Sequence, residues 1–344
     1  MSPPAIPMTT LSNGVKQPQL GFGTSAAGTA EEQLYKAVHT ALDAGYRYID
    51  TAERYKNEAL LGRAIKDYIA TGKLTREDIF ITSKLPFYGH ADPAFYIEES
   101  LRKLDTPYLD MFMIHWSMPG VKVPGKDEGV RQENGEYAHD LTPFIDTWRV
   151  FEKYYKEGKI RSLGVCNLNE EQLQDLFDKA EIKPHNLQIE CHIFLPQYEM
   201  HALCKKLNMT MTAYAPLGSR GRTVFQAADA VVEADPLTFP LVKQLSEKYG
   251  KTPAQILIRQ VLQRGISTIP KSVTPSRIIE NISVFDFELT EDEMAQFAAI
   301  TTRHRLFLFD AAWTHPFYPW PADRDAFWAA RDAAIAAGTA SVTA

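Results

Sequence analysis

The sequence predicts an α/β protein of the (β/α)8 TIM barrel class, with an N-terminal β-hairpin, long loops at the C-terminal face and an extended C-terminal tail. Three observations support this: short β-rich runs alternate with segments of helical spacing, there are eight such runs, and each is apolar enough for a strand buried on both faces. A length of 344 residues suits a single barrel domain over residues 1–344, with 303–344 as a C-terminal extension.

The chain should open with two short antiparallel strands, because Asn13 and Gly14 separate two short runs and Asn-Gly is a strong hairpin signal. The eight barrel strands are then expected within residues 19–24, 46–50, 78–84, 108–116, 160–165, 186–191, 209–215 and 265–271. Helices are expected at residues 31–44, 57–71, 93–104, 142–157, 169–179, 197–206 and 252–263. Thr142 and Thr252 each precede a proline, so each is predicted to cap its helix.

Two connections, 116–140 and 217–235, are too long for simple turns. Both follow barrel strands, so they should lie at the face of the barrel where active sites form. The rival fold is an open, doubly wound sheet. The stretch "GFGTSAAG" lacks the spacing of the phosphate-binding glycine fingerprint, and no helix opens directly on it, which favours the barrel.

Composition narrows the function classes. A net charge of −6 gives no basic surface for nucleic acid. No stretch has the pattern of a signal peptide or a membrane span, and three cysteines without metal-ligand spacing favour reduced thiols, so a cytoplasmic protein is expected. We expect a small-molecule substrate, no membrane partner, no metal, and a monomer or homodimer.

Polar side chains close the predicted strands. They are Asp50, Lys84, His115, Asn167 with Cys166, Gln188 with Glu190, Tyr214 and Lys271. Any one of them alone could be an ion pair or a polar cap inside a barrel. Because the carboxyl ends of barrel strands converge on one mouth, the set together predicts a functional site there.

These residues lie in motifs that resemble the aldo-keto reductase superfamily, which includes aldose, aldehyde and xylose reductases. The motifs are "GYRYIDTAERYKNE", "SKL", "IHW", "NLQIECH", "AYAPLGS" and "IPKSVTPSRIIEN", in the family's order over roughly residues 9–300. The resemblance implies NADPH-dependent reduction of an aldehyde or ketone to an alcohol. It also implies a catalytic tetrad of Asp50, Tyr55, Lys84 and His115.

The chemistry of these side chains supports the tetrad. Hydride addition builds negative charge on the carbonyl oxygen, so a proton donor and a second hydrogen-bond donor must meet there. An ammonium about 4 Å from a phenol is worth roughly 4 kcal/mol at an effective dielectric of 20, so Lys84 is expected to favour the phenolate of Tyr55 by about three pKa units. Asp50 supplies the counter-charge to Lys84.

His115 precedes Trp116, and an apolar wall there should lower its pKa and leave a neutral imidazole that orients the substrate oxygen. The opposite assignment, in which His115 is the acid, stays open at this stage.

The resemblance assigns the nicotinamide carboxamide to Asn167 and Gln188, and stacking on the ring to Tyr214. Cys166 stands where most relatives have serine, so it is expected as a neighbour of the cofactor rather than a donor. Lys271, Ser272 and Arg277 could all reach an adenosine 2'-phosphate, which favours NADPH over NADH; alternatively, they form a basic helix start that faces solvent. The expected cofactor-binding residues are Gly23, Thr24, Asp50, Cys166, Asn167, Gln188, Tyr214, Leu217, Ser219, Lys271, Ser272, Val273, Thr274, Arg277, Glu280 and Asn281.

The substrate pocket is expected to be more polar than an aromatic-aldehyde site. Its expected residues are Ser25, Arg54, Tyr55, His115 and Trp116. Arg54 could clamp a carboxylate, a phosphate or hydroxyls, which points to short polar aldehydes, sugars or keto acids; alternatively, it is a surface arginine paired with Glu53. The tail helix predicted at residues 322–338 is either a lid or a segment packed on the outer wall.

Two other function classes compete with the reductase. One is a cofactor-binding regulatory or structural member of the same fold, resembling a potassium-channel β subunit or a lens crystallin. The other is a metal-dependent aldolase or isomerase, for which only Asp50, His115 and Glu190 are available as ligands, with Lys84 repelling a cation among them.

Overall fold

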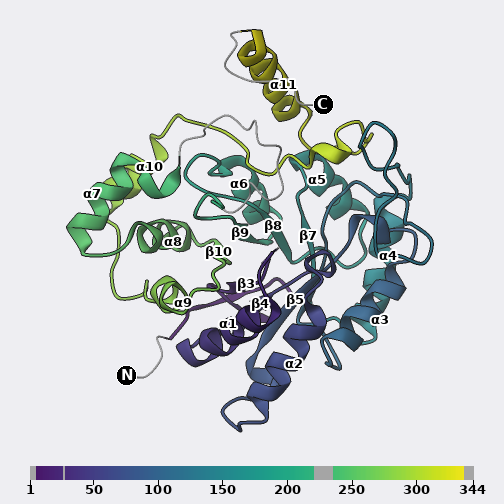
Figure 1. Ribbon diagram of the computed structural model, residues 1–344, viewed down its shortest axis with the longest axis horizontal. Coiled ribbons are helices and arrows are strands. Elements are labelled where there is room, and N and C mark those ends of the chain that lie inside the picture. The colour runs from purple at the N-terminus through teal and green to yellow at the C-terminus, as the bar shows by residue number, and fades with distance from the viewer. Residues whose placement is uncertain (1–4, 26–27, 221–234, 337–344) are drawn as a thin grey trace.

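The computed structural model describes residues 5–25, 28–220 and 235–336, and its centre is a barrel of eight parallel strands surrounded by helices (Figure 1). In chain order the strands are β3 (Phe22–Gly23), β4 (Tyr48–Asp50), β5 (Phe80–Leu85), β6 (Met111–Ile114), β7 (Leu163–Cys166), β8 (Asn186–Glu190), β9 (Thr210–Tyr214) and β10 (Ser267–Thr268). Each strand pairs in parallel with the next. Parallel bridges from Leu20 to Thr268 and from Gly23 to Lys271 join the last strand to the first. The predicted (β/α)8 barrel is confirmed.

The predicted N-terminal hairpin is also present and plugs one end of the barrel. Its strands β1 (Met8–Thr10) and β2 (Lys16–Pro18) are antiparallel, and Gly14 takes a φ of +87° in the turn. Leu11 is only 2% exposed and belongs to a buried cluster with Tyr48, Phe80 and Met111, the first residues of β4, β5 and β6. The hairpin therefore covers the amino-terminal end of the barrel and leaves the opposite mouth for a site.

The seven predicted helices all form, with ends within two residues of the predicted ones. The structure has α1 (Glu31–Ala44), α2 (Glu58–Ile69), α3 (Pro93–Lys103), α4 (Phe144–Lys156), α5 (Glu170–Lys179), α6 (Tyr198–Lys206), α7 (Pro240–Tyr249), α8 (Pro253–Gln263), α9 (Pro275–Ile282), α10 (Glu291–Ala298) and α11 (Pro321–Ala336). No helix in the described ranges is long and apolar enough to cross a membrane.

One of the two predicted threonine caps forms. Thr252 makes a capping box, accepting from the Gln255 amide while the Gln255 side chain accepts from the Thr252 amide. The prediction for Thr142 was wrong. Its amide and its hydroxyl both donate to Oδ1 of Asp140 at 2.8 Å, so Asp140 captures the threonine in a turn before the helix begins.

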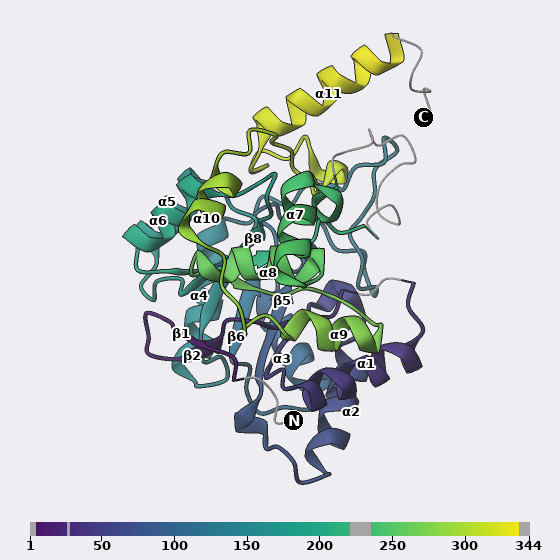
Figure 2. The ribbon, with the colours of Figure 1, turned by 90° about the vertical axis from the view of Figure 1, so that its left-hand side faces the viewer.

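The C-terminal extension crosses the mouth and is fastened to the loop that follows β6. The Tyr137 amide donates to the Ala311 carbonyl at 2.7 Å, and the Ser117 hydroxyl donates to the Phe317 carbonyl at 3.1 Å. Beyond this segment, α11 projects away from the barrel (Figure 2). The ring of Trp313 contacts α11 through Trp328 at a centroid distance of 4.7 Å. The helix itself is therefore neither a lid nor a segment packed on the outer wall.

Candidate active site

A buried ion pair lies beneath the mouth of the barrel. β4 and β5 are neighbours, and Lys84 Nζ lies 2.6 Å from Asp50 Oδ1 and 2.8 Å from the Thr51 carbonyl. Gln188 Nε2 donates to the other carboxylate oxygen, Oδ2, at 2.7 Å. Burial alone would lower the pKa of Lys84, but the Asp50 carboxylate beside it raises that pKa above its ordinary value. The ammonium is therefore charged although its side chain is fully buried.

Tyr55 lies above this pair, on the 3-10 turn (Glu53–Tyr55) that follows β4. Lys84 Nζ is 5.1 Å from the centre of its ring. Burial raises the pKa of Tyr55, and Lys84 lowers it, with a net rise above the ordinary value. Lys84 does favour the phenolate, as expected, but burial of the phenol outweighs the ammonium, which the sequence did not predict. The phenol stays protonated at neutral pH, as a proton donor must.

His115 follows β6 and completes the cluster. Its ring meets the Tyr55 ring edge-on, with centroids 5.9 Å apart. Burial, then Lys84 and then Arg54 hold the pKa of His115 well below its usual range, so the imidazole is neutral as expected. Its Nδ1 is buried and has no hydrogen-bond partner in the described part of the chain. An unpaired lone pair costs less than an unpaired N–H, which places the proton on Nε2.

Three of the expected nicotinamide ligands meet beside the tetrad. The Tyr214 hydroxyl donates to Asn167 Oδ1 at 2.8 Å, and Asn167 Nδ2 donates to the His115 carbonyl at 3.0 Å. Gln188 donates its amide hydrogen to Asp50, and its Oε1 has no partner among the described residues. Cys166 is 1% exposed with its sulfur 3.5 Å from the Met113 sulfur, so it is a packed neighbour of the site rather than a donor.

At the end of β3, Gly23 and Thr24, which were expected to bind the cofactor, also stabilise the barrel. A Cβ at Gly23 would lie 2.6 Å from the Ile269 carbonyl, so the glycine is required where the barrel closes. The Thr24 hydroxyl donates to the Asp50 carbonyl at 2.8 Å. Ser25 is exposed. Leu217 and Ser219 begin the second long loop, whose residues 221–234 lie outside the described ranges.

The expected 2'-phosphate site surrounds the start of α9. Lys271 and Arg277 are exposed and form no ion pair within the described residues. The Ser272 hydroxyl accepts from the Thr274 amide at 3.1 Å, while Glu280 accepts from the Thr252 hydroxyl at 2.7 Å. The other two expected residues here are Val273, which is half-buried, and Asn281, which is buried. Two unpaired cations beside the free amides of a helix start are suited to an anion.

Arg54 faces an aromatic wall. Its guanidinium carbon lies 4.8 Å from the centre of the Phe87 ring and 5.7 Å from that of Phe309, and it has no hydrogen-bond or ion-pair partner among the described residues. The alternative pairing with Glu53 is wrong, because Glu53 is 2% exposed and accepts from the Tyr88 hydroxyl at 2.7 Å as well as from Lys56. Among the residues that the structure describes, Arg54 is therefore a cation without a counter-ion, one residue from Tyr55.

The rest of the pocket wall is more aromatic than expected. The ring of Trp116 lies 4.8 Å from Phe309, and Phe309 lies 5.9 Å from Tyr137. Phe307 approaches Tyr214 edge-on at 5.5 Å. The sequence predicted that the loop 116–140 lies at this face of the barrel, but Tyr137, Phe307 and Phe309 were not among the expected pocket residues. The apolar alternation in "RLFLFD" was the available signal.

Two further features lie apart from the tetrad. Glu190 ends β8, but its carboxylate accepts from the backbone of the tail, so the metal-dependent alternative loses one of its three ligands.

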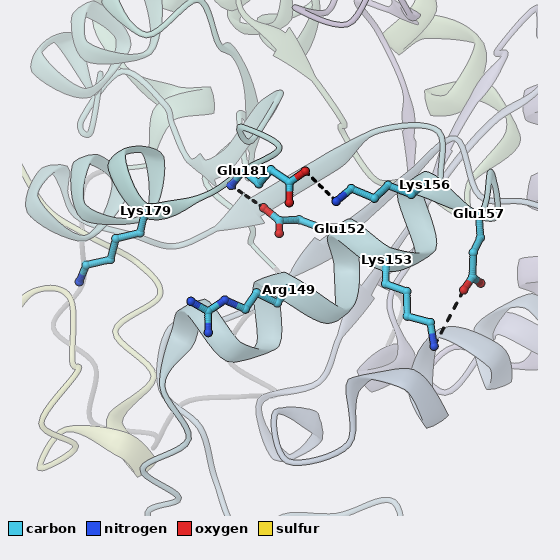
Figure 3. A pocket seen from close by; sticks show the side chains of 7 residues that line it. All are labelled: Arg149, Glu152, Lys153, Lys156, Glu157, Lys179 and Glu181. Carbon is cyan, nitrogen blue, oxygen red and sulfur yellow. Dashed lines mark hydrogen bonds and ion pairs between the residues drawn. The ribbon is translucent and has the colours of Figure 1, made fainter.

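A groove on the outer face of α4 and α5 is lined by seven charged side chains (Figure 3). Each of its four cations already has a carboxylate partner: Lys156 pairs with Glu181 and Lys153 with Glu157 in the groove, and Arg149 and Lys179 pair with aspartates on their own helices. The groove is therefore a weak candidate for a reaction site.

Comparison with known proteins gives one family. Residues 19–302 match the family model described as aldo/keto reductase family. The chain is 40% identical over 300 residues to aldo-keto reductase family 1 member A1 of Gallus gallus, covering 86% of this chain and 89% of that protein. It is 39% identical over 325 residues to the Bos taurus protein of the same name, covering 90% and 96%. A solved structure of an aldose reductase from Schistosoma japonicum superposes with a TM-score of 0.83 at 36% identity, covering 92% of this chain and all of that one.

Proposed function

The chain belongs to the aldo/keto reductase family, and from this premise we propose that it reduces an aldehyde or a ketone to the alcohol with NADPH, using Tyr55 as the proton donor. As a family member it is an oxidoreductase acting on carbonyl or alcohol groups. One observation carries the proposal: a protonated phenol sits above a buried Asp50–Lys84 pair and edge-on to a neutral imidazole. A purely structural protein has no need to keep a buried charged pair at its mouth.

The groups beside the tetrad fit a nicotinamide. Tyr214 is half-buried and held by Asn167. Gln188 Oε1 is an acceptor without a partner among the described residues, which suits the amide of a carboxamide. The nicotinamide supplies the hydride when it is bound.

The side chains handle the charge that forms on the substrate oxygen. Tyr55 donates its hydroxyl proton to that oxygen as negative charge develops, and the Nε2–H of His115 donates a hydrogen bond that orients it. The Lys84 ammonium stabilises the tyrosinate left behind. Asp50 keeps Lys84 charged, and Gln188 holds Asp50 in place. The low pKa of His115 argues against the rival assignment, because its charged form is scarce at neutral pH.

NADPH oxidation with a panel of aldehydes, aldoses and keto acids tests the function directly. We expect turnover with several members of the panel. Absence of turnover with all of them, while NADPH still binds, would favour the regulatory or structural alternative.

We expect Arg277→Ala to raise the Michaelis constant for NADPH about 10- to 100-fold and to leave that for NADH nearly unchanged, because a charge-assisted hydrogen bond to a phosphate is worth about 1.5–3 kcal/mol. Arg102→Ala is a matched control, since Arg102 is an exposed arginine that pairs with Glu99 on α3. Initial rates with both cofactors provide the measurement. Equal changes for NADPH and NADH would contradict a phosphate contact.

Because of Arg54, we propose that the pocket favours carbonyl compounds that bear an anionic or hydroxylated group. Arg54→Met keeps an unbranched side chain of similar length against Phe87 and Phe309 while it removes the charge. We expect the Michaelis constant for a carboxylated aldehyde to rise about tenfold or more, and that for benzaldehyde to change less than about threefold. The same change for both substrates would show that Arg54 only packs.

A further inference from the structure

We propose that Glu190 is a positioning residue for the substrate pocket. Its buried carboxylate fixes the C-terminal tail in the position that brings Phe307 into contact with Tyr214 and Phe309 into contact with Arg54. The inference rests on the proposed reductase function, because it treats this wall as the substrate wall. It concerns a side chain with no part in the tetrad.

The carboxylate of Glu190 receives three hydrogen bonds. The Leu306 amide donates to Oε1 at 2.7 Å, and the Phe307 amide donates to Oε2 at 3.0 Å. His192 Nε2 lies 2.8 Å from Oε1, and its Nδ1 accepts from the Phe194 amide at 3.2 Å, so the imidazole proton is on Nε2 and points at Glu190. Glu190 and His192 have no exposed side-chain surface, so water cannot replace these donors.

The two clamped amides lie where the tail becomes pocket wall. Phe307 meets the Tyr214 ring edge-on at 5.5 Å, and two residues further on, Phe309 lies 4.8 Å from Trp116 and 5.7 Å from the Arg54 guanidinium. A third contact secures the start of this stretch, where the His304 amide donates to the Phe194 carbonyl at 3.1 Å. A shift of the tail at Glu190 would therefore move both aromatic rings relative to the mouth.

β8 couples this wall to the chemistry. Gln188 and Glu190 are two residues apart, so their side chains leave the strand on the same side. Gln188 holds Asp50 at 2.7 Å, and Glu190 holds the tail. Two side chains of one strand thus hold both the tetrad and the aromatic wall in place. The tail is therefore part of the site, and Glu190 is the residue that anchors it.

The test compares Glu190→Gln with Glu152→Gln in the full chain. A glutamine at 190 keeps the shape but turns an NH2 group toward one of the two donating amides. We expect the Michaelis constant for benzaldehyde to rise about tenfold or more and kcat to change less than about threefold. By hydrogen exchange, the amides of Leu306 and Phe307 should be protected in the wild-type protein and should exchange faster in the variant.

Glu152 is a matched control on the outer wall. It is 5% exposed, and its Oε1 accepts from the consecutive backbone amides of Glu181 at 2.8 Å and Ile182 at 2.9 Å. The two tail amides at Glu190 instead donate to different carboxylate oxygens. Glu152→Gln should lower Tm but leave the Michaelis constant unchanged. If both variants only lower Tm, Glu190 is a structural residue and the inference fails.

Two further measurements keep the inference testable if Glu190→Gln does not fold. Glu190→Asp keeps the charge and withdraws it by one methylene, so it should raise the Michaelis constant in the same direction; an unchanged value overturns the inference. Rapid exchange of the Leu306 and Phe307 amides in the wild-type protein overturns it as well. The two proposals fail in different ways. If Tyr55→Phe abolishes activity but the Glu190 variants keep the wild-type Michaelis constant, only the inference on Glu190 is wrong. If Tyr55→Phe keeps full activity, the proposed function is wrong.

Discussion

Replacing Tyr55 with phenylalanine is expected to lower kcat for aldehyde reduction by about 10²- to 10⁴-fold, the usual contribution of a positioned general acid. The substitution removes one oxygen and keeps the ring that contacts His115 and lies over Lys84. Binding of NADPH, followed by fluorescence titration, should change little. A loss of less than tenfold would overturn the assignment of Tyr55 as the donor.

The comparison with His115→Gln separates the two possible acids. Glutamine retains an N–H donor at the mouth, so it can orient the substrate oxygen but cannot act as an acid near neutral pH. Because the pKa of His115 is well below its usual range, we expect this variant to lose at least about tenfold less kcat than Tyr55→Phe. A larger loss in His115→Gln would favour the imidazole as the donor.

The barrel could be predicted because its signals are local. Each strand is a short apolar run and each helix a stretch of regular spacing, and the polar residues that end the strands must converge once the sheet closes. Asp50, Lys84 and His115 therefore meet as expected. Thr142 failed as a cap because a neighbouring aspartate competes for it, and a spacing rule does not weigh such competition.

The missed features depend on contacts between distant parts of the chain. Arg54 meets Phe309, and Glu190 meets Leu306, more than a hundred residues away in each case. No periodicity near either residue records its partner. The sign of the pKa shift of Tyr55 was missed for a related reason: the sequence identified the ammonium that lowers the pKa, whereas the burial that raises it depends on the whole mouth.

The buried pair should dominate the stability of the site. Lys84→Met and Asp50→Asn are each expected to lower the free energy of unfolding by about 3–5 kcal/mol, because each leaves the other charge buried without its counter-ion. Within the described ranges, the Asp50 carboxylate keeps only the Gln188 amide after Lys84→Met, and the ammonium keeps the Thr51 carbonyl after Asp50→Asn. Urea unfolding of the full chain measures both losses.

The double variant identifies the cause of the loss. If an uncompensated charge is responsible, Lys84→Met combined with Asp50→Asn should cost less than the sum of the single changes by at least about 1 kcal/mol, since neither charge is then left alone. Lys159→Met provides the control, because Lys159 pairs with Glu98 at 2.6 Å, the same distance as in the buried pair, but both side chains are at least 40% exposed. That change should cost no more than about 1 kcal/mol. Additive losses in the double variant would mean that each side chain stabilises the barrel through its own packing, and Asp50 would then lose its assigned task of keeping Lys84 charged beneath Tyr55.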